Sequence, residues 1–156
     1  MGGKIVGSPM AIQLTFETTK QIHAFLEAAY PNEGAGLLLG DDWDGQRRVQ
    51  AILPLANSRE SAARHNRYLI TPQDMLHGEQ EAIRLGLDIV GIFHSHPDSP
   101  NRPSEFDREW ALPWFSYLIT TVTAGQAQGS RSWRLEEDRS QFTEESVAVL
   151  PTPPDS

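Results

Sequence analysis

The stretch LDIVGIFH, residues 87–94, constrains the fold of this 156-residue chain more than any other. Successive side chains of a strand point to opposite faces, and here both faces are apolar. A strand of this kind is covered on both sides, as the central strands of α/β sheets are. We therefore expect residues 87–94 to form a central strand. By alternation, Val90 and Ile92 should share the face that carries His94.

Two histidines, His94 and His96, stand at the end of this run with one residue between them. On a strand, residues two apart project to the same face, whereas on a helix they would diverge. We expect the pair where the strand leaves the core, because Pro97 cannot donate a ladder hydrogen bond. Two imidazoles on one face offer two nitrogen ligands to a metal ion.

Asp107 is the candidate for a third ligand. The proline-rich loop 97–103 can fold back over the strand end, and its prolines limit the entropy lost on ordering. A catalytic zinc takes three protein ligands and leaves its fourth position to water. Ser104 and Asp107 also have the spacing of a helix capping box. The two interpretations are compatible, since a capping position would hold Asp107 rigidly.

Other chemistries fit the sequence poorly. Ser95 lies between the histidines, but no GxSxG elbow surrounds it, which argues against a serine nucleophile. A dinucleotide fingerprint opens a helix, whereas a strand follows the loose glycine string Gly34, Gly36 and Gly40. The remaining histidines are expected to be ordinary surface or core residues: His23, His65 and His77.

Composition narrows the function classes. The chain has no cysteine, so disulfides, thiolate metal sites and cysteine nucleophiles are excluded. The net charge of −8 argues against nucleic acid as the main partner. No apolar stretch has the length of a membrane span and no secretory h-region is visible, so we expect no membrane partner and a cytoplasmic protein.

Periodicity and turn residues predict an α/β fold in which a mixed sheet is flanked by helices. Strands are expected at 10–15, 35–40, 48–57, 68–71, 87–94, 114–122, 132–138 and 145–150, and helices at 17–30, 73–86 and 104–112. We expect a flexible leader at 1–9, a single domain at 10–150 and a disordered tail at 151–156. The tryptophans are expected mostly in the core, with one alternative, that Trp110 and Trp114 wall a substrate groove.

The string HSHP followed by a serine and an aspartate, at His94, His96, Ser104 and Asp107, resembles the motif of the JAMM (MPN-plus) metalloproteases. That motif includes an acid on a much earlier strand, and PNEGAGLLLG makes Glu33 the matching residue. The resemblance implies a mixed sheet with a cytidine-deaminase-like three-layer arrangement. It also implies one Zn²⁺ per chain, held by His94, His96 and Asp107.

The resemblance further implies roles and substrates. Glu33 would be the general base, and the Ser104 hydroxyl would stabilise the oxyanion. Short connecting segments make the chain similar to the compact prokaryotic form. Family members cleave isopeptide or C-terminal bonds of ubiquitin-like proteins, and the prokaryotic relatives process sulfur-carrier proteins. The sequence leaves a homo-oligomer open.

Two alternatives remain. One is a non-catalytic interaction scaffold, as in MPN relatives that have lost the ligands; the intact ligand set argues against it. The other is a RadC-like protein, which would carry a basic surface and a helical N-terminal region. The acidic composition argues against that reading.

Overall fold

The computed structural model describes residues 10–56 and 70–152. The predicted leader 1–9, His65 and residues 153–156 of the predicted tail lie outside this part. The described elements are, in chain order, β1 (Ala11–Thr15), α1 (Phe16–Ala29), β2 (Ala35–Trp43), β3 (Gln46–Leu55), α3 (Pro72–Leu85), β4 (Asp88–Pro97), α4 (Glu105–Trp110), β5 (Ser116–Thr123), β6 (Gln126–Leu135) and β7 (Phe142–Leu150).

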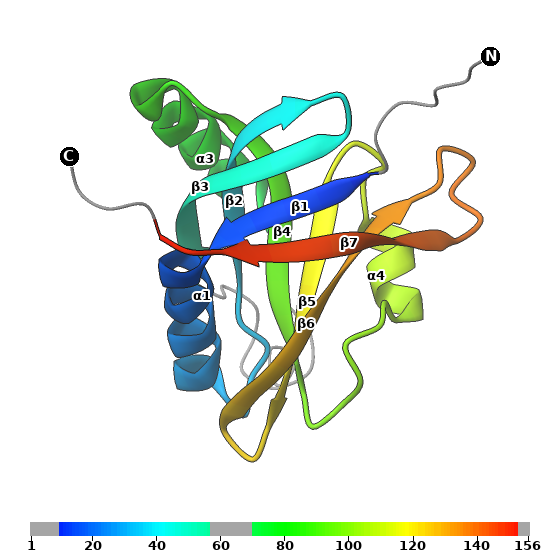
Figure 1. Cartoon of the computed structure of the whole chain (residues 1–156). Helices are drawn as coiled ribbons and strands as arrows, with labels where there is room; N and C mark the ends of the chain where they lie inside the picture. Colours follow the sequence, from blue (N-terminus) through cyan, green and yellow to red (C-terminus); the bar gives the residue numbers. More distant parts are fainter. Residues whose placement is uncertain (1–9, 57–69, 153–156) are drawn as a thin grey trace.

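The strands form one mixed sheet in the order β1-β3-β2-β4-β5-β6-β7, and β7 also pairs with β1, so the sheet closes on itself (Figure 1). The pairs β1–β3, β1–β7 and β4–β5 are parallel, and the other pairs are antiparallel. β4 lies between β2 and β5, which confirms the central strand predicted at residues 87–94.

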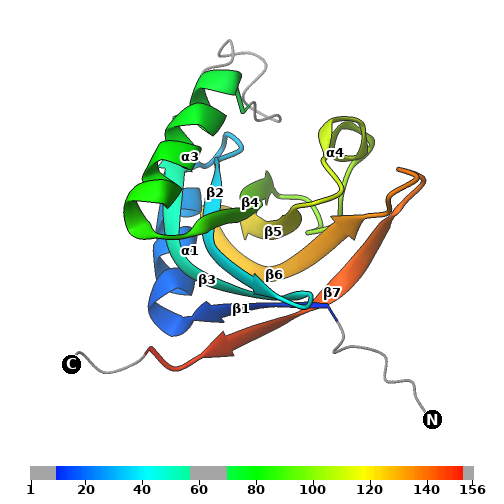
Figure 2. The ribbon, with the colours of Figure 1, turned by 90° about the horizontal axis from the view of Figure 1, so that it is seen from above.

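Helices cover both faces of the sheet. On β2, Leu37 and Leu39 point into an apolar layer that includes Ala82 of α3, whereas Leu38 points into a second layer with Ile22 of α1. Figure 2 shows α3 and α4 on the same side of β4 and β5. The three-layer arrangement is therefore confirmed, and the alternation of β2 produces it because both of its faces are buried.

Local signals set the ends of α3. The Thr71 side chain and Asp74 form a capping box, Pro72 opens the helix, and Gly86 closes it with a left-handed φ of 71°. Of the strand predicted at 68–71, only residues 70 and 71 are described, and neither is in a strand. No helix of the described part is long and apolar enough to cross a membrane.

A bulge in β4 overturns one expectation about its faces. Ile89 pairs with Leu39 and Gly91 with Leu38, which leaves Val90 as an extra residue. The side chain of Val90 therefore packs in the layer beneath α1, and not on the face of His94 as predicted. Ile92, beyond the bulge, lies on the opposite face from Val90, which is the face that it shares with His94. A one-residue shift of register exchanges the faces.

The prediction that the tryptophans lie mostly in the core is wrong for three of the four. Trp43, Trp110 and Trp114 are 71%, 65% and 62% exposed. They stand at the end of β2, at the end of α4 and in the connection to β5, where the chain is already leaving the packed layers. Trp133 is half-buried, and its Nε1 donates to the carbonyl of Asn101 at 3.1 Å.

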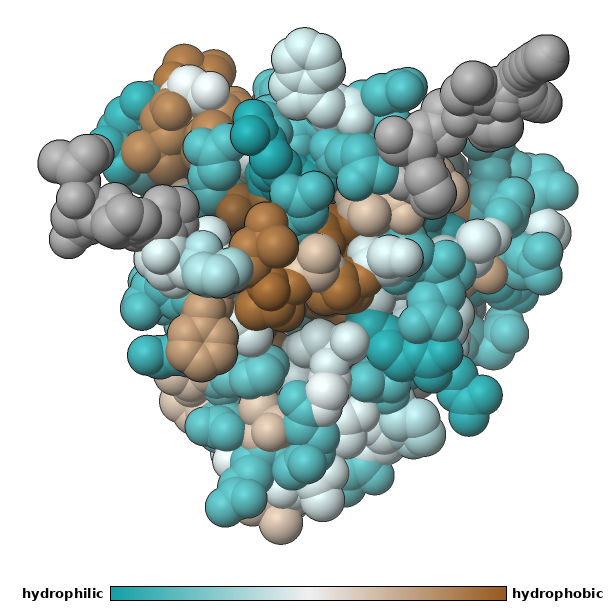
Figure 3. Space-filling view, viewed as in Figure 1, coloured by the Kyte–Doolittle hydropathy of each residue, from teal (hydrophilic) through white to brown (hydrophobic). Residues whose placement is uncertain are grey.

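Apolar side chains also remain on the outer surface. On α3, Leu76, Ile83 and Leu85 are exposed. The space-filling view shows apolar residues gathered over α3 at the upper left, with a second group near the centre of the same face (Figure 3).

Candidate metal centre

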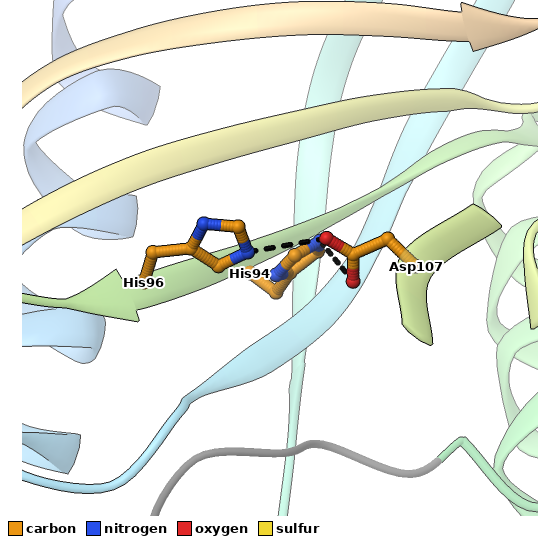
Figure 4. A group of neighbouring side chains, drawn as sticks. All are labelled: His94, His96 and Asp107. Carbon is orange, nitrogen blue, oxygen red and sulfur yellow. Dashed lines mark hydrogen bonds and ion pairs between the residues drawn. The ribbon is translucent and has the colours of Figure 1, made fainter. Parts of the chain in front are cut away.

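β4 brings His94 and His96 to the same face of the sheet (Figure 4). The strand continues through both residues to Pro97, because β5 pairs with it over this whole stretch. His94 is fully buried and His96 is 7% exposed. The histidines are thus held inside the sheet and do not emerge from its end as we expected. Their backbone is fixed by the ladder, which sets the direction of both rings.

α4 supplies Asp107, whose carboxylate faces the two histidines across the centre (Figure 4). The Ser104 hydroxyl accepts from the Asp107 amide at 3.0 Å, and the Ser104 amide donates to Oδ2 of Asp107 at 2.8 Å. This is the predicted capping box, and it confirms that the cap holds the aspartate. The Asp107 carboxylate is buried, so the short helix directs it inward.

Three donor atoms converge at this point. The carboxylate oxygens of Asp107 lie 3.6 Å from Nε2 of His94 and 3.2 Å from Nε2 of His96. One donor atom from each residue lies within 4.8 Å of the other two. Zinc–ligand bonds near 2.1 Å in tetrahedral geometry place neighbouring donors about 3.4 Å apart. Two imidazoles and a carboxylate therefore fit a three-ligand zinc ion in chemistry, and the two distances from the histidines to Asp107 agree with its spacing.

The loop after β4 determines which nitrogen of His96 faces this point. Nδ1 of His96 lies 2.7 Å from the carbonyl oxygen of Pro100, which can only accept, so Nδ1 carries the proton. In the neutral ring Nε2 then carries the lone pair that a metal ion would take, and in the protonated ring Nε2 donates to Oδ2 of Asp107 at 3.2 Å. Outer hydrogen bonds of this kind orient metal-binding histidines. No local pattern identified Pro100, because the contact depends on how the loop folds back.

The surroundings set the protonation of all three residues. Burial lowers the pKa of His94 to about 4, which keeps the ring neutral at pH 7. Burial opposes charge on His96 as well, but the hydrogen bonds to Asp107 and Pro100 outweigh it and raise the pKa of His96. Burial alone would raise the pKa of Asp107, yet the histidines and the Ser104 amide hold it well below its usual range. Asp107 is therefore a carboxylate.

Glu33 and Ser104 flank the three donors. Glu33 is buried in the segment before β2, and its charge contributes to the raised pKa of His96. It does not belong to the group of three donors. Ser104 is exposed, in contrast to the residues around it in the site. The structure thus places both residues beside the centre, and their catalytic roles stay predictions.

Arg139 fastens the helix that carries Asp107. Its guanidinium donates to the carbonyl oxygens of Ala111, Arg108 and Glu109 at 2.7, 3.1 and 3.0 Å. These carbonyls lie at the C-terminal end of α4, where backbone acceptors lack partners within the helix. No sequence pattern points to Arg139, because it acts on α4 from the distant connection between β6 and β7.

Trp114 does not wall this centre. It borders a cleft of about 370 Å³ together with residues of α3 such as Met75 and Ile83, at the start of β4 and β5. Ile89, in the same cleft, precedes His94 by five residues, which corresponds to about 17 Å along a strand. Trp110 does not line the cleft.

Comparison with known families agrees with this geometry. The Prok-JAB model, described as prokaryotic homologs of the JAB domain, matches residues 17–136. The chain belongs to this family. The resemblance stated from the HSHP motif is thereby confirmed, and this JAB domain is a peptidase of the JAMM type.

Two relatives support this assignment. This JAB domain is 34% identical over 108 residues to a probable TtuB-protein conjugate cleaving protease of Thermus thermophilus, covering 67% of this chain and 68% of the relative. It is 33% identical over 119 residues to a desampylase of Haloferax volcanii, covering 76% of this chain and 79% of the relative.

Solved structures share the fold. A solution structure from Salinibacter ruber is 40% identical with a TM-score of 0.70, covering 90% of this chain and 92% of that one. The crystal structure of a JAB1/MPN domain protein from Archaeoglobus fulgidus is 19% identical with a TM-score of 0.55, covering 90% and 99%. The predicted α/β fold of the MPN type is confirmed.

Proposed function

We propose that this JAB domain is a zinc metallopeptidase that cleaves isopeptide or C-terminal peptide bonds of ubiquitin-like or sulfur-carrier proteins. One observation carries the proposal: His94, His96 and Asp107, from β4 and α4, converge as a buried set of two nitrogens and a carboxylate. Such a set leaves one zinc position for water.

A zinc ion held by these residues would supply a Lewis acid that lowers the pKa of water toward about 7. Glu33 then removes a proton from the attacking water and delivers it to the departing amine. Its burial beside His96 suits this task, because a general base must lie close to the donors without binding the metal itself.

Ser104 stabilises the negative charge that develops on the carbonyl oxygen. Its oxygen already accepts the Asp107 amide at 3.0 Å, so its own O–H is available to donate outward. Its exposure leaves it within reach of a substrate. One such donor contributes about 2.7–4 kcal/mol to the transition state in other hydrolases.

Burial of the centre favours an extended substrate. His94, His96 and Asp107 are each at most 7% exposed, so a folded protein surface cannot approach them. A narrow C-terminal tail or an isopeptide link can. The names of the two relatives describe a protease that cleaves TtuB–protein conjugates and a desampylase, and both are consistent with a bond at the tail of a carrier protein.

The test is hydrolysis by the zinc-loaded chain. Candidate carrier proteins with a C-terminal extension, and carriers conjugated to a lysine, are incubated with the protein and products are identified by mass spectrometry. We expect a single cut at the carrier C-terminus that chelation stops and zinc restores. A chain that takes up no zinc and cuts nothing would instead favour the scaffold alternative.

A further inference from the structure

Ser95 occupies the position between the two histidines and points to the opposite face of β4. It is fully buried, on the side where Phe93 packs beneath α1. A hydroxyl in such a layer is costly unless it is hydrogen-bonded. Its partner therefore indicates why a polar residue stands there.

That partner is the backbone of Gly34. The Gly34 amide donates to Oγ of Ser95 at 2.9 Å, and the Ser95 amide donates to the carbonyl of Gly34 at 3.1 Å. The ladder between β2 and β4 ends one step earlier, at Ala35 and His94. In a regular antiparallel pair the Gly34 amide would donate to the backbone carbonyl opposite. The serine hydroxyl takes the place of that carbonyl where the chain turns away from β4.

The far side of Gly34 is equally constrained. A Cβ atom at this position would lie 3.0 Å from Cβ of Ala29 and 3.0 Å from Cδ2 of Leu26. The segment is thus pressed against α1 on one side and bonded to Ser95 on the other. Glu33 is the residue directly before it.

We infer that Ser95 is a positioning residue for Glu33. Ser95 joins the segment that carries the general base to the strand that carries two metal ligands. The position of Glu33 relative to those ligands is therefore fixed at this one residue of β4. The inference rests on the proposed role of Glu33. A base displaced by about 1 Å costs about a hundredfold in rate, so one hydroxyl can control turnover from the far face of the strand.

Ser95→Ala tests this directly. We expect kcat to fall about tenfold to a hundredfold, while KM and the zinc dissociation constant each stay within about twofold. Amide exchange followed by NMR gives a readout independent of activity: the Gly34 amide should be protected in the wild type and exchange rapidly in the variant. Ser95→Thr keeps the oxygen and should restore both protection and kcat.

Thr120→Val is the matched control. Thr120 is fully buried beside Ser95 on β5, and its hydroxyl bonds to the hydroxyl of Ser130 at 2.6 Å, whereas the Gly34 amide bonds to Ser95. The control should lower the melting temperature and leave kcat unchanged. If Ser95→Ala does not fold, the nearly isosteric Ser95→Cys, a weaker acceptor, takes its place in the comparison.

A double-mutant cycle separates this inference from the proposed function. In the Glu33→Gln background, Ser95→Ala should lower kcat no further, since its effect passes through Glu33. Equal losses in both backgrounds, a loss of zinc parallel to the loss of rate, or an unchanged kcat in Ser95→Ala would each overturn the positioning role. If Glu33→Gln alone hydrolyses at the native rate, the proposed base is wrong. The exchange of the Gly34 amide still reports on its hydrogen bond to Ser95.

Discussion

Nε2 of His96 lies 3.2 Å from Oδ2 of Asp107, although the two residues are 11 positions apart and belong to different elements. The same oxygen accepts the amide of Ser104, so one carboxylate closes a helix cap and faces two imidazoles. The centre therefore depends on a helix end as much as on a strand, and its parts can be tested separately.

Removal of a ligand should abolish metal binding without unfolding the chain. His96→Ala and Asp107→Ala each leave two donors of three, and we expect zinc content near zero and hydrolysis at background. Zinc is measured by mass spectrometry of the purified protein and folding by circular dichroism. His77→Ala, an exposed histidine on α3, is the control and should retain both properties.

Glu33→Gln should retain zinc and lose turnover, because the amide cannot accept a proton. General acid–base catalysis contributes about 10²–10⁴-fold, and kcat should fall by that factor. Steady-state kinetics and zinc titration measure the two quantities on the same sample. Glu109→Gln, an exposed residue of α4, should match the wild type.

Two substitutions at Ser104 distinguish oxyanion stabilisation from capping. Both Ser104→Ala and Ser104→Gly remove the hydroxyl, but glycine at an N-cap costs only a few tenths of a kcal/mol and alanine about 1 kcal/mol. If the hydroxyl serves the oxyanion, kcat falls about 10²–10³-fold in both variants. Thermal melts should still distinguish the two variants, with a lower melting temperature for Ser104→Ala than for Ser104→Gly. If Ser104→Gly keeps the native kcat, Ser104 has a capping role alone.

Acid should destabilise the metal-free chain through His94. Its folded-state pKa of about 4 is below the ordinary 6.5, so the unfolded chain binds the proton more tightly. The contribution of His94 to the free energy of unfolding is complete above pH 6.5, and about 3 kcal/mol of it is lost as the pH falls to 4. The pKa of His96 is raised, so its contribution is already complete below pH 6.5. Urea unfolding after chelation, compared with His94→Leu, measures the difference; equal slopes would contradict it.

Arg139→Ala should weaken zinc binding from outside the ligand set. Without its bonds to the end of α4, Asp107 is held less firmly, and outer contacts of metal sites contribute about 10–100-fold in affinity. Competition with a chelator of known affinity gives the dissociation constant. Arg131→Ala, which removes an exposed pair with Glu144, is the control and should change it little.

Much of the centre could be predicted from short-range patterns. The spacing of His94 and His96, the capping box of Asp107 and the ends of α3 are geometries within a few residues, and each formed as expected. Pro100 and Arg139 could not be predicted, since both act through backbone carbonyls that carry no sequence signature. The three exposed tryptophans were predicted wrongly, because residue type alone does not tell where a chain leaves its core.

The sequence by itself determined which side chains are available and which neighbours share a face or a helix turn. Strand alternation and caps are local, and they follow from backbone geometry. Only the tertiary structure decided that Val90 turns away from His94, that α4 meets β4, and that Gly34 bonds to Ser95 from 61 residues away. Those relations depend on strand register and sheet closure, where one extra residue reverses every face that follows.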